Sequence, residues 1–349
     1  MNKNFSRASF ALLLFSVLLF ACQKDVNETT LTKQVQQDAK IFQQGSPMQL
    51  LKGTGVSLGS AVGQSGDLFV PDGTTGSILR IDPKTGDFTT FATGLPPLIP
   101  AVGIGGVTDV TFIGGKAYAL VTMVDDPNLF PTGQVNGIYR IDGPNSFKII
   151  ADIGAFNLAN PPTGFTFFIS TGVSYSIQPF NGGFLVTDGH LNRVLHVTLD
   201  GKISVIKSFG DIVPTGLAVR GNQIFLSQAG PVPHLPENGK VVSFDIFSNN
   251  VTTVASGAPL LVDVEFGRGQ TLFALSQGPG SGGPDGSPAV PNTGSLVRVE
   301  ADGTFSVIAD ELNQPTSLEI IGNTAYIVTL SGDVWTVENI AGPPFGRPH

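Results

Sequence analysis

Two short segments place an aspartate at the same point of an alternating apolar run: VTDVTF around Asp109 and LVDVEF around Asp263. The flanking apolar residues indicate a buried strand in both cases. Carboxylate oxygens are ligands that Ca²⁺ and other hard cations prefer. The same side chains can instead cap their own strand or accept backbone N–H groups from a neighbouring one, which also perturbs acids. Both a cation site and a structural role are open for these residues.

The two segments belong to a repeated unit. From about residue 48 onward, short runs rich in Val, Ile and Phe alternate with Gly, Asn, Asp and Pro turns, and residues 214–257 are the clearest copy. Four consecutive antiparallel strands cannot bury both faces of their sheet alone, but radially stacked copies can. We therefore predict an all-β fold, a six-bladed β-propeller. A sandwich of unrelated strands is the alternative.

The ends of the repeat array match one another. Five copies of the last strand of the unit begin at Thr89, Lys148, Ser204, Thr252 and Ser306. A sixth copy, QLLKGTG, stands at residue 49 with no unit before it, whereas residues 314–340 supply three strands and no fourth. We expect residues 48–53 to complete the last blade and close the ring, because closure removes exposed strand edges.

Aligning the first strand of every unit on PTGLAV defines one position per blade, occupied in order by Gly59, Asp109, Ser174, Gly216, Asp263 and Ser317, with a shift of two residues left open in the third blade. Blades two and five face each other in a six-membered ring. Asp109 and Asp263 are therefore expected on opposite sides of the channel as candidate metal ligands. Glu265 and Glu319, two residues further along, are candidate ligand-binding residues.

Loop lengths distinguish the two faces of the predicted ring. Long connections gather on one face, at residues 96–106, 122–136, 156–171, 228–239 and 277–293, whereas the other face has tight turns. Long loops on a rigid scaffold usually carry binding, although insertion drift in surface loops is the alternative. Phe165 and Phe167 are predicted to line an apolar ligand surface there or to form a lid over the channel. His234 belongs to the same face and is a further ligand-binding candidate.

Groups for other kinds of catalysis are scarce. The chain has four histidines, of which His349 is terminal and His196 lies in a predicted strand, so a nucleophilic triad has little support. His190 and His234 are expected on or near the face of the long loops, and a lone loop histidine is more often solvated than catalytic. We find no residue-by-residue match to the metal-binding motifs of lactonase propellers. No catalytic residue is assigned.

The first residues predict export. Lys3 and Arg7 precede an apolar run at residues 10–20 that is too short to span a bilayer. Residues 19–22, LFAC, resemble a bacterial lipobox with Cys22 as the lipidated residue; cleavage near residue 21 that leaves a free thiol is the alternative. We predict a signal peptide at 1–21, a polar tether at 22–46 and the propeller at 47–349. A bacterial cell envelope lipoprotein, held at the outer membrane by its lipid anchor, is the expected localisation.

Charge limits the partners. The net charge is −8 and the pI about 4.9, which argues against nucleic acid and anionic lipid. Cys22 is the only cysteine, so disulfides in the folded part are excluded. We expect a monomer that binds a peptide, a glycan or a small molecule.

Four segments, VTDGHLNRVLHV, VPTGLAV, LVDVEFGRGQTLFAL and GSLVRVEADG, follow one another in an order that resembles the ScyD/ScyE family of NHL-like propellers. The resemblance covers most of residues 105–336. It implies six blades, and it implies that Asp188, Asn192 and Arg193 fasten the turn between the second and third strands. It implies no established activity.

Two functions from different classes are therefore open. The first is a non-catalytic binding scaffold whose long loops hold the ligand, and it is preferred because no catalytic constellation is evident. The second is a metal-dependent hydrolase or lactonase with Ca²⁺ or another divalent cation in the channel mouth.

Overall fold

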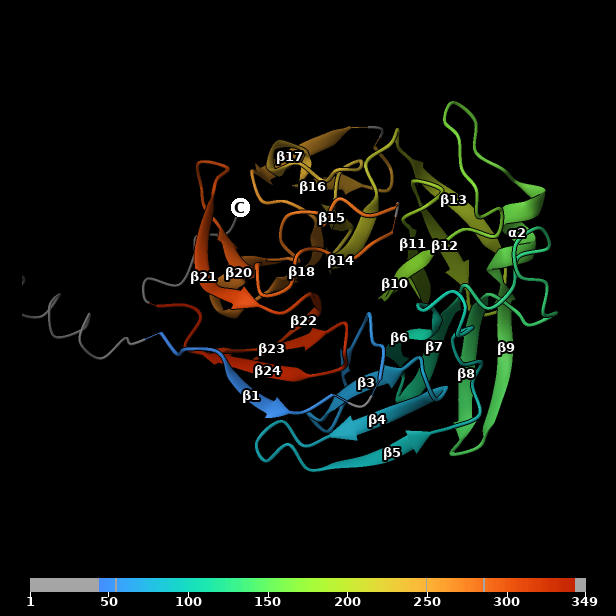
Figure 1. Cartoon of the computed structure of the whole chain (residues 1–349), viewed down its shortest axis with the longest axis horizontal. Helices are drawn as coiled ribbons and strands as arrows, with labels where there is room; N and C mark the ends of the chain where they lie inside the picture. Colours follow the sequence, from blue (N-terminus) through green and yellow to red (C-terminus); the bar gives the residue numbers. More distant parts are fainter. Residues whose placement is uncertain (1–43, 54, 249, 285, 343–349) are drawn as a thin grey trace, which may run out of the picture. The chain divides into compact units, whose positions relative to one another are not determined.

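The computed structural model describes residues 44–53, 55–248, 250–284 and 286–342. They form six antiparallel, four-stranded sheets arranged as the blades of a ring (Figure 1). The first strand of each blade packs against the first strand of the next, and that of blade six packs against that of blade one. The predicted six-bladed β-propeller is thus confirmed. Cys22, the predicted signal peptide and most of the predicted tether lie outside the described residues.

The strands of the first three blades follow one another from the channel outward. Blade one contains β2 (Ala61–Val62), β3 (Leu68–Asp72), β4 (Ser77–Ile81) and β5 (Phe88–Ala92). Blade two contains β6 (Gly106–Ile113), β7 (Lys116–Thr122), β8 (Gly137–Gly143) and β9 (Ser146–Asp152). Blade three contains β10 (Ser174–Phe180), β11 (Gly183–Asp188), β12 (Arg193–Thr198) and β13 (Ile203–Ser208).

The next two blades repeat this order, and the last one borrows a strand. Blade four contains β14 (Pro214–Arg220), β15 (Gln223–Gln228), β16 (Lys240–Asp245) and β17 (Val251–Ser256). Blade five contains β18 (Leu261–Phe266), β19 (Leu272–Ser276), β20 (Gly294–Val299) and β21 (Phe305–Leu312). Blade six contains β22 (Pro315–Ile321), β23 (Thr324–Thr329), β24 (Val334–Glu338) and, outermost, β1 (Met48–Leu51).

Strand β1 closes the ring as predicted. It pairs with β24 in antiparallel register, with Met48 opposite Thr336 and Leu51 opposite Val334. Leu51 also packs against the apolar cluster between blades six and one, which includes Val334. The closing strand therefore satisfies the edge of blade six and contributes to the core.

The core lies between neighbouring blades because strands bury alternate residues on both faces of each sheet. Between blades two and three, for example, Tyr118 and Leu120 pack against Phe184 and Val186. The Tyr118 and Phe184 rings are 4.8 Å apart between centroids. Val, Ile, Leu and Phe suit such positions since they fill a pleated, buried surface.

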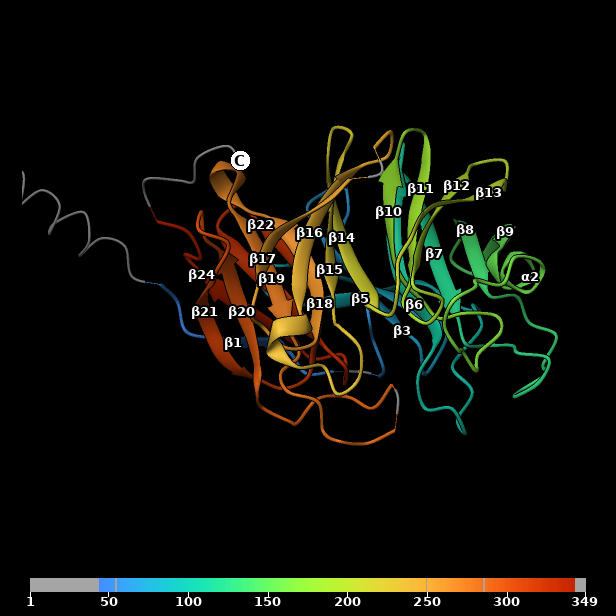
Figure 2. The ribbon, with the colours of Figure 1, turned by 90° about the horizontal axis from the view of Figure 1, so that it is seen from above.

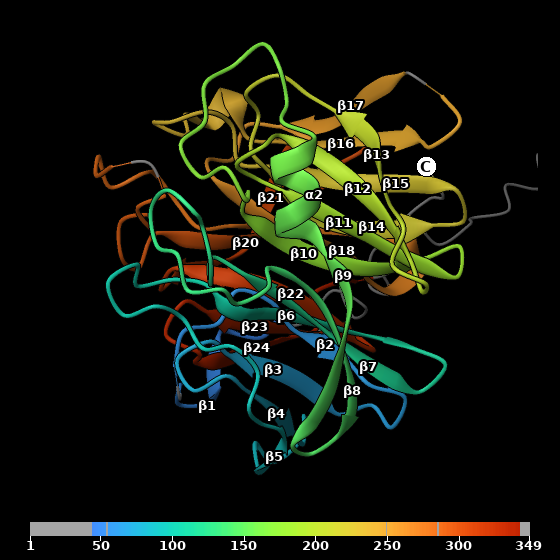
Figure 3. The same cartoon turned by 90° about the vertical axis from the view of Figure 1, so that its right-hand side faces the viewer.

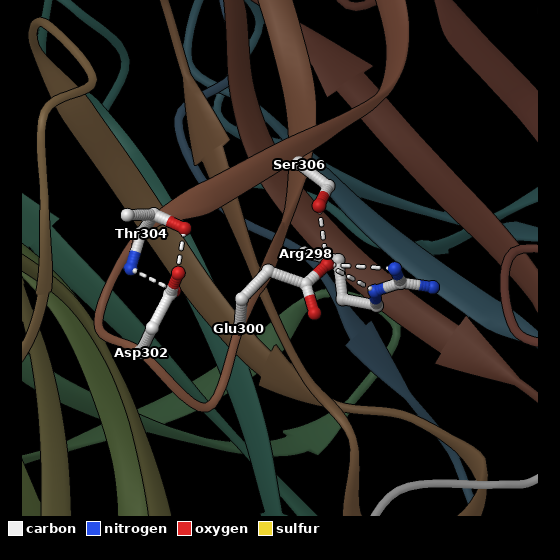
Figure 4. Close-up of polar contacts among 5 residues, drawn as sticks. All are labelled: Arg298, Glu300, Asp302, Thr304 and Ser306. Atoms are coloured by element: carbon white, nitrogen blue, oxygen red, sulfur yellow. Dashed lines mark hydrogen bonds and ion pairs between the residues drawn. The ribbon is translucent and has the colours of Figure 1, made fainter. Parts of the chain in front are cut away.

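One face of the ring carries short hairpins fixed by local polar contacts. In the hairpin between β20 and β21, Glu300 accepts hydrogen bonds from Arg298, at 2.6 Å, and from Ser306 (Figure 4). Asp302 at the turn accepts hydrogen bonds from the backbone N–H and the hydroxyl of Thr304. Such Asx-type contacts stabilise tight turns. This side is called the short-turn face below.

The opposite side, called the long-loop face below, collects the long connections (Figure 2). The connection after β9 begins with helix α2 (Ile153–Ala159), seen in Figure 3. Asp152 caps this helix by accepting the N–H of Ala155 at 2.8 Å. The sequence indicates only a loop here, because seven residues are too few for a helical period to be recognisable. Two 3₁₀ turns, η1 (Pro236–Asn238) and η2 (Arg268–Gln270), complete the described elements.

None of the helices in the described part of the chain is long and apolar enough to cross a bilayer.

Candidate functional site

Each inner strand from β6 onward breaks its register with its partner at the same point. The irregularity falls between Val107 and Asp109 in β6, between Leu261 and Asp263 in β18, and at matching places in β10, β14 and β22. A bulge re-aims the side chain that follows it. In this ring the re-aimed residues line the central channel.

The predicted alignment is correct except in the third blade. There Ile177 pairs with Val186 as Val110 pairs with Ala119 in blade two, so Ser176 and not Ser174 matches Asp109. Ser174 precedes the bulge, and its N–H donates to the Thr122 hydroxyl at 3.0 Å. The segment SYS has serine at both places, so composition could not separate the two.

The two aspartates bridge neighbouring blades. Asp109 accepts the N–H of Val110 in its own strand at 2.8 Å and the N–H of Ile177 in blade three at 2.9 Å. Asp263 repeats this arrangement half a ring away, with Val264 at 2.9 Å. Its other oxygen accepts the N–H of Leu318 in blade six at 2.7 Å. Each carboxylate therefore ties one blade to the next.

The residues on either side of each aspartate are also alike. Gly59 precedes Asp109 in the ring and Gly216 precedes Asp263, and an added Cβ at either glycine would stand only 2.2 or 2.1 Å from the carboxylate. Ser176 and Ser317 follow the aspartates. Around the ring, the six positions of this layer therefore follow the order Gly, Asp, Ser, Gly, Asp, Ser. Because glycine has no Cβ, each carboxylate has room beside the glycine that precedes it.

The next layer, two residues further along each strand, does not share this repeat. It contains Thr111 and Gln178 in the first half of the ring, and Glu265 and Glu319 at the matching places in the second. Glu265 accepts the N–H of Phe266 at 3.2 Å. Because Thr111 and Gln178 occupy the matching positions in the other half of the ring, the propeller fold does not require glutamate at residues 265 and 319.

Burial dominates the electrostatics of the channel. It raises the pKa of Asp263 to about 7 and the pKa of Asp109 well above its ordinary value, against the effect of the N–H donors. The pKa values of Glu265 and Glu319 are also raised well above normal, by burial first and then by the neighbouring carboxylates. Confined carboxyl groups avoid mutual repulsion by holding protons. Burial thus shifts all four pKa values in the same direction, upward.

Tyr175 blocks the channel. Its side chain extends from blade three to blade six on the opposite side of the ring, where its hydroxyl donates to the Thr316 carbonyl at 2.9 Å. The space left among the channel residues is about 10 Å³, roughly the space for one water molecule. This space cannot admit an organic substrate.

The channel residues fit a metal ion only in part. Both oxygens of Asp109 and of Asp263 already accept backbone N–H groups. Among the described residues no group of three or more His, Cys, Asp or Glu side chains is placed to hold a metal. Carboxylate oxygens have further lone pairs, so a cation site at these aspartates stays a prediction.

The phenylalanine-bearing loop at 160–171 belongs to the long-loop face, and none of its residues lines the channel cavity. Phe165 and Phe167 contact each other, with ring centroids 6.2 Å apart, and the Phe168 side chain is 54% exposed. His190 fixes the loop because its Nε2 accepts the N–H groups of both Phe168 and Ile169 at 3.0 Å. The two predicted placements of these phenylalanines, in an apolar ligand surface or in a lid over the channel, both stay predictions.

Buried polar groups hold this loop from below. Asp126, fully buried, accepts hydrogen bonds from Ser170 and Thr171 in the neighbouring loop. Burial alone would raise the pKa of Asp126, but these bonds and that from Asn128 outweigh it and lower the pKa. Asp188 accepts hydrogen bonds from Asn157 at 2.8 Å and from Val173 at 3.0 Å.

The other two residues of the turn after β11 extend the same network. Arg193 donates to Asn157 at 2.7 Å and to the Asn160 carbonyl at 2.8 Å. Asn192 accepts the N–H groups of Ile212 and Val213. Asp188, Asn192 and Arg193 therefore have structural partners, and they position the loop as well as their own turn.

His234 stands apart from the channel. Its Nδ1 donates to the Gly230 carbonyl at 2.7 Å, within its own loop. The structure brings together Asp109, Asp263, Glu265 and Glu319. It does not bring His234, Phe165 or Phe167 to them, so the predicted candidates divide between the channel and the long-loop face.

Sequence reasoning missed a groove outside the channel. It lies between the loop after β5 and the blade formed by β6–β9, has a volume of about 310 Å³, and is lined by Leu95, Pro97, Val135, Tyr139, Phe147 and Ile149 among others. Burial raises the pKa of Tyr139 to about 12, and its hydroxyl donates to the Val135 carbonyl at 2.8 Å. The alternation of Phe147 and Ile149 on an outer strand was the available signal.

Comparisons with known proteins identify the fold. No protein-family model matches the chain, and no curated protein sequence matches it. Many solved structures do. A gluconolactonase from Xanthomonas campestris has 12% identity and a TM-score of 0.57, covering 84% of this chain and 89% of its own.

Two further structures carry other activities. A PQQ-bound aldose sugar dehydrogenase from Streptomyces coelicolor has 15% identity and a TM-score of 0.57, over 84% of this chain and 98% of its own. A virginiamycin B lyase from Staphylococcus aureus has 15% identity and a TM-score of 0.51, with the same coverage of both chains. At such identities the likeness shows the propeller fold and no shared chemistry.

Proposed function

We propose that this protein is a non-catalytic binding scaffold that holds its ligand with the long-loop face. The observation that carries the proposal is the way the aromatic loop at 160–171 is fixed. His190 accepts two successive backbone N–H groups of that loop, and buried Asp126 accepts hydrogen bonds from its Ser170 and Thr171. A loop held in one conformation gains affinity because little ordering entropy is lost on binding.

The channel supports the same choice. Tyr175 crosses it, and about 10 Å³ of space remains. An organic substrate that must reach Asp109 or Asp263 would first have to displace the tyrosine. The channel residues are better suited to holding the blades together.

A metal-dependent lactonase is the second candidate, because four carboxyl groups with raised pKa values line one channel. A bound cation would balance the negative charge of ionised carboxylates in such a cluster, and Asp109 and Asp263 would be its first ligands. We place this reading second because all four oxygens of these aspartates accept N–H groups.

We also propose the cellular setting that the N-terminal sequence predicts: export, lipidation at Cys22 and display in the bacterial envelope. The resemblance to ScyD/ScyE proteins agrees with the observed fold and stays a proposal as a family assignment.

One experiment compares the two functions. Full-length protein is analysed for bound divalent metal, assayed on a panel of lactones and aryl esters, and screened for binding to a peptide library and a glycan array. We expect no turnover, and binding that is lost in Phe165→Ser/Phe168→Ser. Turnover that needs a divalent metal and is lost in Asp109→Asn/Asp263→Asn would overturn the scaffold and establish the hydrolase.

A further inference from the structure

We infer that the groove beside blade two binds an extended, uncharged apolar peptide segment of another protein. This inference goes beyond the proposed function, because it concerns a second site whose lining includes no residue of the aromatic loop at 160–171. The walls of the groove are the connection after β5, the end of the loop before β8, and the outer strand β9.

The lining favours apolar side chains. Leu95, Val135, Phe147 and Ile149 line the groove. Its lining has two polar side chains, Gln134 and Tyr139, and the Tyr139 hydroxyl already donates a hydrogen bond to the Val135 carbonyl. Phe147 is 37% exposed and Ile149 43% exposed. Burying these two side chains against a partner would add favourable apolar contact.

Charge narrows the partner further. No Asp, Glu, Lys or Arg lines the groove in the described part of the chain, and residues 93–106 and 153–171 contain none either. Lys148, between Phe147 and Ile149, points to the other side of the strand. Asp125 belongs to the loop that supplies Gly133 and Gln134 to the groove, but its carboxylate is already used, because it accepts the N–H groups of Thr132 and Gly133. A charged segment would lose hydration here without gaining a partner.

Size and shape favour a peptide over the other ligands. Sites for small organic molecules span about 300–1,000 Å³ and enclose most of the ligand, whereas this groove, at about 310 Å³, is at the lower limit and open along one side. A glycan would need more hydrogen-bonding side chains than Gln134 provides. Anionic lipid would need basic side chains, which the lining lacks. An extended segment can place a few apolar side chains in the groove and leave its backbone at the rim.

The test uses a substitution with matched controls. Ile149 lies opposite Tyr139 on the outer strand of blade two, and Val205 and Val307 occupy the same register in blades three and five, opposite Leu195 and Val297. All three are exposed. Substituting lysine adds the same charge at each of the three positions, so the three variants differ only in which blade carries the substitution.

Random dodecapeptides displayed on phage are selected on full-length protein, and one selected peptide is synthesised with a fluorescent label. We expect the selected sequences to be rich in Leu, Ile, Val, Phe and Pro and poor in charged residues. Ile149→Lys should weaken binding by about tenfold or more, while Val205→Lys and Val307→Lys change it less than about twofold.

The alternatives give different results. Peptides whose binding is weakened by Phe168→Ser but not by Ile149→Lys would overturn this inference and leave the proposed function standing. A glycan whose binding shows the same pattern would lead to the same conclusion. Ligands that respond to neither substitution would overturn both. Flotation of unlipidated Cys22→Ser protein with phosphatidylcholine vesicles, abolished by Ile149→Lys, would replace the peptide with a lipid surface. Concentration-dependent dimerisation abolished by Ile149→Lys would replace it with a second copy.

Discussion

The Tyr175 hydroxyl lies 2.9 Å from the Thr316 carbonyl oxygen, and this hydrogen bond joins two blades on opposite sides of the ring. Contacts between adjacent blades, such as that from Asp263 to Leu318, only pass from one blade to the next. Tyr175 therefore acts as a cross-brace in the channel.

Removing this brace should lower stability modestly. Tyr175→Phe keeps the ring and loses the hydroxyl, which costs about 1 kcal/mol, and we expect Tm to fall by about 2–4 °C. Tyr139→Phe is the matched comparison, because it also loses a hydrogen bond from a hydroxyl to a carbonyl, but one that connects β8 to Val135 just before it and not two blades. Thermal unfolding followed by circular dichroism measures both. An unchanged Tm for Tyr175→Phe would show that the brace contributes nothing.

The closing strand gives a second prediction. Deleting residues 23–51 removes β1, exposes the edge of β24 and separates the two ends of the ring, so the protein should melt far lower or aggregate. Deleting residues 23–43 keeps β1 and its pairing with Thr336 and Val334, and should leave Tm unchanged. Equal melting of the two deletions would contradict the role assigned to β1.

The space beside each aspartate gives a third. Gly216→Ala would place a Cβ 2.1 Å from the Asp263 carboxylate, which must then move away from Val264 and Leu318. Losing such a buried hydrogen-bonded contact costs about 1–3 kcal/mol. Gly210→Ala is the control, since nothing lies within 4 Å of the added Cβ there. Chemical denaturation of both variants compares their free energies of unfolding; similar values would contradict the steric argument.

The pH dependence follows from the channel carboxyl groups. A carboxyl group ordinarily has a pKa near 4, and burial raises the pKa of Asp263 to about 7. Between these values the folded protein binds more protons than the unfolded chain, so the free energy of unfolding falls as the pH rises from about 4 to about 7. The raised pKa values of Glu265 and Glu319 act in the same direction.

Wild-type protein should therefore melt several degrees higher near pH 5 than near pH 8. Glu265→Gln/Glu319→Gln removes two of the groups and should flatten this dependence by raising Tm near pH 8. Glu237→Gln, at an exposed position in η1, is the control. A wild-type Tm that rises with pH over this range would contradict the direction of the shifts.

The proposed anchor is tested by fractionation. Lipid on Cys22 should hold the protein in membranes at high salt, because anchoring by more than one acyl chain depends on buried methylenes and not on charge. Cys22→Ser should release the protein or stall its processing. Fractionation of Cys22→Ser with membranes, as for the wild type, would exclude lipidation as the tether.

The number of blades could be predicted from the sequence because repeats can be counted. A spare strand at residue 49 and a missing one after residue 338 left one arrangement that closes. The carboxylate layer at Asp109 and Asp263 was also predictable, since these residues occupy the same place in two aligned strands. Both results depend on local patterns repeated along the chain.

The other features of the site depend on how distant parts of the chain pack together. The bulge in β10 decides between Ser174 and Ser176, and a bulge leaves no mark in composition. Tyr175 meets Thr316 only because half a ring separates their blades. The groove at Ile149 is formed by two segments that are unremarkable alone, a proline-rich connection and an outer strand. Such features follow from packing and not from periodicity.

Residues at the two described ends of the propeller lie on the same side. Gly45 donates its N–H to the Glu338 carbonyl, and Asn323, in a hairpin of the short-turn face, contacts Ala341. A reporter or affinity tag fused at either described end, before residue 44 or after residue 342, is thus joined to the fold on the side away from the long loops. A support that holds the protein through such a tag is therefore attached on the side opposite the long loops.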